Sequence, residues 1–180
     1  LGVLNPDDCY AFCRDMVERY PELHFDFNAH NDYDLAVANV AAAVKAGVQG
    51  IHTTVNGLGE RAGNAPLSSV IAVLNDHLKV RNTIVEKSIN HVSRIVETYT
   101  GIHIPANEPV VGENVFTQCA GIHADGDNKD NLYYNDLLPE RFGRVREYAL
   151  GKMSGKANIK KNLDTLGIDL DEEAMRKVTE

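Results

Sequence analysis

Strand-like and helix-like stretches alternate along the first 80 residues, and no other feature of this chain restricts its fold as strongly. Residues 24–28 alternate polar and apolar side chains, as a half-buried strand does. An Ala-rich helix is expected over 35–46, ended by Gly47, and a strand rich in β-branched residues over 48–55. A further helix is expected over 65–78. This order predicts right-handed βαβ units in a parallel sheet.

The first residues of the chain extend this pattern. Residues 1–4 have the character of a strand end, and the chain has no initiator Met, so we expect that other residues precede it in a parent protein. Asn5-Pro6-Asp7-Asp8 predicts the start of an amphipathic helix that continues to Tyr20. Three strands cannot close a barrel, and a complete (β/α)₈ barrel needs about 250 residues. We therefore expect an α/β fold, namely the C-terminal part of a TIM barrel with about three βα units.

The alternation stops near Asn82, and a mostly helical C-terminal region is expected beyond it. Its predicted helices cover 84–99, 160–166 and 171–178. The expected domain organisation has three parts: 1–80, the C-terminal part of a TIM-barrel catalytic domain; 81–145, a helical and loop extension; and 146–180, a small helical linker subdomain.

Composition excludes several classes of function. A net charge of −8 disfavours nucleic-acid binding, which needs a clustered positive excess. No apolar run is long enough to cross a bilayer, and no signal-peptide pattern is present, so no membrane association is expected. The three cysteines form no Cys-x-x-Cys motif and favour a reducing cytoplasm. Basic residues gather over 141–161, as either a solvated helix face or a patch for an anionic cofactor.

A first cluster of candidate ligands follows the strand at 24–28. Asn28, His30, Asn31 and Asp32 bring oxygen and imidazole donors to a strand end, a combination that suits Mg²⁺, Mn²⁺ or Zn²⁺. The alternative is a strand-to-helix turn with a surface His, in which Asp32 and Asp34 are candidate caps of the next helix.

A Gly-rich loop follows the next strand. Residues 57–62 match Gly-x-Gly-x-x-Ala, the pattern of a dinucleotide-binding loop. Glu60 argues against that function because its carboxylate would repel a pyrophosphate. In the barrel interpretation, Glu60 and Arg61 pair near a metal-bound acid while Asn64 supplies an oxygen.

Two further candidates lie in a polar, turn-rich segment. His123 and Tyr133 have no distinctive spacing, so by themselves they are interpreted as a surface residue and a packing residue.

Taken together, these motifs resemble a known family, the metal-dependent (β/α)₈ Claisen-condensing enzymes that include 2-isopropylmalate, citramalate and homocitrate synthases. His30-Asn31-Asp32 is similar to the family's His-x-His-Asn-Asp strand, and residues 56–64 resemble its second motif. Residues 121–126 and 150–155 resemble motifs of the region after the barrel. Four motifs in the family's order are more specific than any one of them.

The resemblance implies roles for individual residues. His30 would be a metal ligand and Asn64 a nearby oxygen donor, with Glu60 and Arg61 holding the site. Glu60 would also be a catalytic residue. Asn31 and Asp32 would support the substrate and the loop. Asn28 stands where the family has its first His, and an amide is a weaker zinc donor, so lower metal affinity or a preference for Mg²⁺ or Mn²⁺ is expected. His123 and Tyr133 match a His and a Tyr that assist proton transfer, often in the partner subunit's site.

The resemblance also implies an activity. Acetyl-CoA would be condensed with a 2-oxo acid, pyruvate or 2-oxoisovalerate, to a 2-hydroxy dicarboxylic acid in branched-chain amino-acid biosynthesis, by a homodimer. Residues 133–146 look closer to citramalate synthases, which use pyruvate. The family's metal-binding Asp and catalytic Glu belong to earlier strands, so this chain alone is expected to be inactive. The alternative is a non-catalytic assembly or regulatory module with a decayed metal site, for which Asn28 is the main support.

Overall fold

The computed structural model describes residues 2–120, 122, 125–126, 135–152 and 154–179. The chain divides into two compact units, Leu1–Glu113 and Asn114–Glu180. No helix in the described ranges is long and apolar enough to span a bilayer. The three-part organisation at 1–80, 81–145 and 146–180 stays a prediction.

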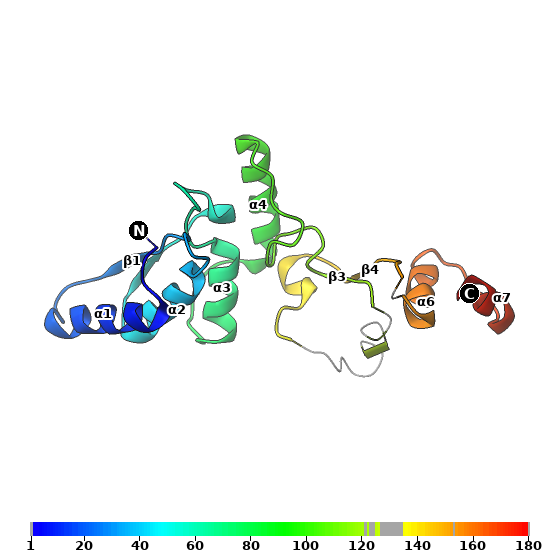
Figure 1. The fold of residues 1–180 in the computed structure, drawn as a ribbon, viewed down its shortest axis with the longest axis horizontal. Coiled ribbons are helices and arrows are strands. Elements are labelled where there is room, and N and C mark those ends of the chain that lie inside the picture. Colours follow the sequence, from blue (N-terminus) through cyan, green and yellow to red (C-terminus); the bar gives the residue numbers. More distant parts are fainter. Residues whose placement is uncertain (1, 121, 123–124, 127–134, 153, 180) are drawn as a thin grey trace. The chain divides into compact units, whose positions relative to one another are not determined.

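The N-terminal unit alternates helices and strands in the expected order (Figure 1). Its elements are α1 (Pro6–Arg19), β1 (Asp26–Asn28), α2 (Ala36–Ala46), β2 (Gly50–His52), the 3₁₀ turn η1 (Val55–Gly57), α3 (Leu67–Asp76) and α4 (Glu86–Thr100). The mixed helix and strand structure confirms an α/β fold.

The strands β1 and β2 are parallel, with Asp26 opposite Gly50, Phe27 opposite Ile51 and Asn28 opposite His52. Helices α1 and α2 lie side by side (Figure 1). They enclose a core to which Phe27 adds its ring, formed by Cys9, Cys13, Ala42, Ala43 and Ala46. Successive side chains of a strand point to opposite faces, so Asp26, Asn28 and His52 share the face away from this core, and all three are exposed.

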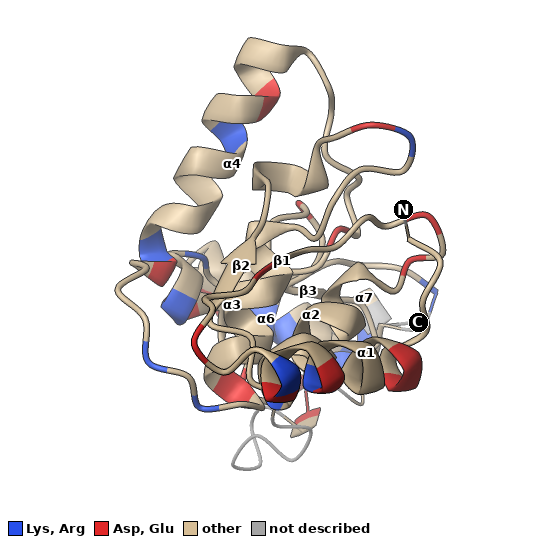
Figure 2. Cartoon of the chain, turned by 90° about the vertical axis from the view of Figure 1, so that its left-hand side faces the viewer, with Lys and Arg blue, Asp and Glu red and all other residues tan. Residues whose placement is uncertain are grey.

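Charged side chains cover the outer side of α1. Figure 2 shows acidic and basic residues interspersed along this helix. Arg14 pairs with Glu18, and Arg19 with Asp15, each across one helical turn. Such exposed pairs contribute little stability. The buried face that carries Cys9 and Cys13 therefore fixes the position of the helix.

The start of α1 and the end of α2 are predicted correctly, but the capping side chain at the start of α2 is predicted wrongly. The Asn5 side chain accepts a hydrogen bond from the Asp8 amide at 2.9 Å, and Gly47 ends α2 in the left-handed conformation. Neither Asp32 nor Asp34 caps α2. Instead, Asn31 Oδ1 accepts from the Ala36 amide at 3.1 Å, because the chain turns through Asp34 at a φ of 59° and brings Asn31 over the helix start.

The strand count also differs from the expectation. Residues 2–4 are not part of a strand, and the described sheet of the N-terminal unit has two strands instead of three. Gly2 instead donates its amide to the Asp32 carboxylate at 3.3 Å. The number of βα units thus stays a prediction.

The C-terminal unit contains a second sheet that the sequence did not predict. The two-residue strands β3 (Thr117–Gln118) and β4 (Glu147–Tyr148) pair in parallel. The other described elements are η2 (Pro139–Phe142), α6 (Lys156–Thr165) and α7 (Glu172–Thr179). The fully buried Asn158 side chain connects α6 to the ends of both strands by donating to Cys119 O at 2.8 Å and Ala149 O at 3.0 Å.

Candidate active site

The two motifs of the N-terminal unit lie against each other. His30, just after β1, forms an antiparallel bridge with Asn64, and the Asn31 amide donates to Gly63 O at 3.0 Å. Two residues further on, Pro66 forms a parallel bridge with Thr54, just after β2. The Gly-rich loop therefore pairs with the residues that follow both strands, and it holds Asn64 beside His30.

Two glycines allow this loop to close. Gly63 has a φ of 82°, and a Cβ atom at this residue would lie 1.9 Å from the Gly57 carbonyl oxygen. A Cβ atom at Gly59 would lie 2.0 Å from Asn64 Nδ2. Contacts this short do not occur between real atoms. A side chain at Gly59 would therefore displace the Asn64 amide group, and one at Gly63 would displace the Gly57 carbonyl that accepts a hydrogen bond from the Asn64 backbone amide.

An ion pair fastens the same loop to the turn after β1. Arg61 Nε donates to Asp32 Oδ1 at 2.7 Å, and Arg61 Nη2 donates to Asp32 Oδ2 at 3.1 Å. The guanidinium group therefore binds both carboxylate oxygens in a bidentate pair. These hydrogen bonds from Arg61 lower the pKa of Asp32 to about 2. The main partner of Arg61 is thus Asp32.

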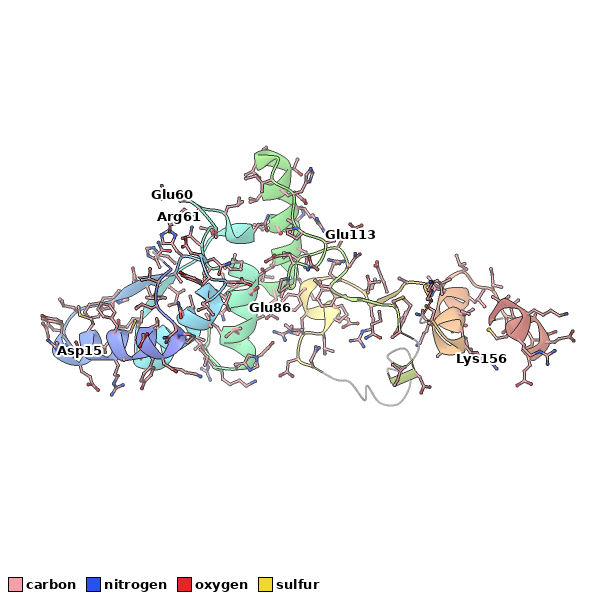
Figure 3. All side chains as sticks on the ribbon, viewed as in Figure 1. Asp15, Glu60, Arg61, Glu86, Glu113 and Lys156 are labelled. Atoms are coloured by element: carbon pink, nitrogen blue, oxygen red, sulfur yellow. The ribbon has the colours of Figure 1, made fainter. Side chains whose placement is uncertain are left out.

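Glu60, the partner expected for Arg61, lies further away. Its Oε2 is 3.8 Å from Arg61 Nη1, and its side chain is 87% exposed. Figure 3 shows the two residues next to each other at the tip of the loop between η1 and α3. The Glu60 carboxylate therefore projects into the surroundings of the loop.

Two polar atoms at the meeting point of the motifs are buried without a hydrogen-bond partner: His30 Nδ1 and Asn64 Oδ1. The Asn64 amide group is oriented by its Nδ2, which donates to Leu58 O at 3.1 Å, so Oδ1 stays available. Buried polar atoms are nearly always satisfied, and an imidazole nitrogen with an amide oxygen forms a donor set that divalent cations accept.

The remaining candidate ligand is Asn28, which lies two residues before His30 and is exposed. Within the described part of the chain, no group of three or more His, Cys, Asp and Glu side chains has an arrangement that could hold a metal ion. The donors present, one imidazole and two amides, fit part of a divalent metal site.

A cavity of about 210 Å³ opens beside Asn64. Asn31, Leu58 and Glu108 also line it. Burial, with a contribution from the Asp34 charge, raises the pKa of Glu108. Glu108 was not among the predicted site residues, because an isolated acid in a Pro-containing loop forms no recognisable pattern.

The other predicted residues divide into two groups. Asn31 acts on the local structure: besides capping α2, its Nδ2 donates to Asp34 Oδ1 at 3.2 Å. His123 and Tyr133, the predicted proton-transfer pair, lie outside the described residues.

Polar donors gathered where parallel strands end are the arrangement on which (β/α)-barrel enzymes build their sites. Residues 1–96, more than half of the chain, match the HMGL-like family, and the chain belongs to that family. Residues 110–180 match a second family, described as homocitrate synthase post-HMGL domain-like.

The relatives carry the names that the motifs predicted. The chain is 40% identical over 179 residues to a putative (R)-citramalate synthase of Methanopyrus kandleri, covering 99% of this chain and 35% of the relative. It is 42% identical to a homocitrate synthase of Sulfolobus acidocaldarius and 38% identical to a probable 2-isopropylmalate synthase of M. kandleri, covering 99% of this chain and 38% and 36% of these relatives. The predicted family is confirmed, and the chain spans little more than a third of these relatives' length.

Solved structures support the fold. An HMG-CoA lyase from Acinetobacter baumannii in complex with coenzyme A and 3-methylmalate matches 58% of this chain and 36% of its own, with a TM-score of 0.52 and 22% identity. An HMG-CoA lyase from Bacillus subtilis matches 58% of this chain and 37% of its own, also with a TM-score of 0.52, at 19% identity.

Proposed function

We propose that this chain is part of an acyltransferase that condenses acetyl-CoA with a 2-oxo acid. The observation that carries the proposal is the position of His30 Nδ1 and Asn64 Oδ1 where the two motifs meet. Both are potential metal-ligand atoms that are buried without a hydrogen-bond partner. Relatives named citramalate, homocitrate and 2-isopropylmalate synthase support the reaction class.

In this proposal, His30, Asn64 and the weaker donor Asn28 contribute to a divalent metal site. What the bound cation supplies is Lewis-acid polarisation of the keto group of the 2-oxo acid. The ion pair between Arg61 and Asp32 connects the loop that carries Asn64 to the turn that follows His30.

Proton transfer is assigned to residues outside this cluster. Glu60 is proposed to have a catalytic role, which its exposed carboxylate at the tip of the loop supports. His123 and Tyr133 are proposed to move protons to and from the acetyl-CoA methyl group and the new hydroxyl group, in a homodimer that brings them to the partner's site. If His123→Ala in the parent protein left the turnover rate unchanged, this assignment would be wrong.

The substrate test compares three acids. The candidate acids are pyruvate, 2-oxoisovalerate and 2-oxoglutarate, and branched-chain amino-acid biosynthesis is the proposed pathway. Thiol detection of released CoA, with each acid in turn, ranks them. We expect the parent protein to release CoA and the 180-residue chain alone to release none. CoA release by this chain alone would refute the assignment of essential residues to earlier strands.

A cytoplasmic location belongs to the same proposal. All three cysteines are free thiols, as a reducing compartment favours.

A second candidate function rests on Asn28. An exposed amide at a family His position is also what a non-catalytic assembly or regulatory module with a decayed metal site would show. Assaying the parent protein with added Mn²⁺ separates the two, since only the enzyme releases CoA.

A further inference from the structure

The proposed metal site contains one imidazole, His30, because Asn28 occupies the other family His position. A second imidazole lies on the neighbouring strand, on the same face of the sheet as Asn28. The residue opposite Asn28 in the parallel register is His52, the last residue of β2. Neighbouring strands are about 4.8 Å apart, and both side chains are exposed on the face away from the helices. The His52 ring can therefore occupy the space that an imidazole ring at residue 28 would occupy.

The His52 ring is already oriented by a carboxylate. Its Nε2 lies 3.3 Å from Asp26 Oδ2, and a neutral ring that donates from Nε2 carries its lone pair on Nδ1. Metal-binding imidazoles are commonly held in this way, with one nitrogen on a carboxylate and the other on the metal. Room for the carboxylate comes from Gly50, where a Cβ atom would lie 1.6 Å from Asp26 Oδ1.

A second ring shares this carboxylate but is placed differently. His24 Nε2 lies 2.9 Å from Asp26 Oδ1, and the His24 and His52 side chains are 66% and 64% exposed. His24, however, precedes β1, and four extended residues separate it from Asn28 by about 13 Å. It thus matches His52 in chemistry, partner and exposure while lying toward the opposite end of the strands.

We propose that His52 supplies, from β2, the imidazole ligand that Asn28 does not supply from β1. The metal site is then assembled from His30, His52 and Asn64, with Asp26 as the positioning residue for His52. This inference rests on the proposed function, because it concerns the same metal site.

Cobalt binding tests the inference without an activity assay. Co²⁺ is titrated into the parent protein while its visible absorption, which reports nitrogen ligands and coordination geometry, is followed. The variants are His30→Ala, His52→Ala, the control His24→Ala, and the double variant Asn28→His with His52→Ala. His52→Gln, with thermal unfolding of every variant, separates loss of the ligand from loss of the fold.

We expect His30→Ala, His52→Ala and His52→Gln each to weaken Co²⁺ binding about 10- to 100-fold or more. His24→Ala should change affinity by less than about threefold, and Asn28→His should restore binding in the His52→Ala protein. If His52→Ala bound Co²⁺ normally while His30→Ala did not, the inference would be wrong and the proposed metal site would stand. An equal loss in His24→Ala would also overturn it, since the cluster would then act through Asp26. If Co²⁺ failed to bind the parent protein, or if His30→Ala bound it unchanged, the metal site of the proposed function would itself be refuted.

Discussion

Substituting Gly63 with Ala should disrupt the loop that holds Asn64. The added Cβ atom would lie 1.9 Å from the Gly57 carbonyl oxygen, a backbone atom fixed by its hydrogen bond from the Asn64 amide at 2.9 Å. The left-handed backbone at Gly63 adds about 1–2 kcal/mol for any L side chain. Overpacking of this kind adds about 1–3 kcal/mol. The expected loss is thus about 2–5 kcal/mol in the free energy of unfolding.

Gly101→Ala is the matched control. Gly101 lies in the same unit and has a φ of 69°, but nothing lies within 4 Å of its Cβ position. Only the backbone cost of about 1–2 kcal/mol is therefore expected. Urea unfolding measures the difference in stability between the two variants, and a separate Co²⁺ titration of each folded variant measures its metal affinity. Only Gly63→Ala should also lose metal affinity. Equal destabilisation with unchanged metal affinity in both variants would refute the steric argument.

Three further predictions concern other parts of the chain. Replacing the buried Asn158 with Leu should destabilise the C-terminal unit by about 2–4 kcal/mol in thermal unfolding, because Cys119 O and Ala149 O lose their hydrogen-bond donor. As the control, Lys152→Ala at an exposed position should have no measurable effect. Glu97 accepts hydrogen bonds from the Ile104 amide and from Arg94, which lower the pKa of its carboxyl group to about 2. The stability that Glu97 contributes should therefore be complete above its pKa in the unfolded chain and be lost as the pH falls toward 2. Glu97→Gln should remove this part of the pH dependence of unfolding. Burial raises the pKa of the Cys9 thiol to about 12, so an alkylating reagent at pH 8 should modify the exposed Cys119 quickly and Cys9 only after unfolding, as peptide mass spectrometry would show.

Local signals in the sequence were sufficient for the helices and the parallel strands of the N-terminal unit. Asn5 and Gly47 mark helix ends through preferences that depend on a few neighbouring residues. The pair β3–β4 was missed because two-residue strands show no periodicity. Asn31 was missed as the cap of α2 because the turn offers several capping side chains, and only the backbone path selects one.

The candidate site was predictable as a set of residues but not as a set of contacts. Family motifs identified His30 and Asn64, yet the bidentate pair between Arg61 and Asp32 joins residues 29 positions apart, and no local pattern encodes it. The facing positions of Asn28 and His52 likewise depend on the strand register. The contacts within the candidate site therefore follow from the tertiary structure, which the motifs alone do not predict.

The most direct test of the account is CoA release by the parent protein from acetyl-CoA, a 2-oxo acid and Mn²⁺, compared with its His30→Ala variant. The account predicts release that depends on the 2-oxo acid, stops when the metal is chelated, and falls at least about 100-fold in the variant. Release that His30→Ala and chelation leave unchanged, or no release with any of the three acids, would contradict it.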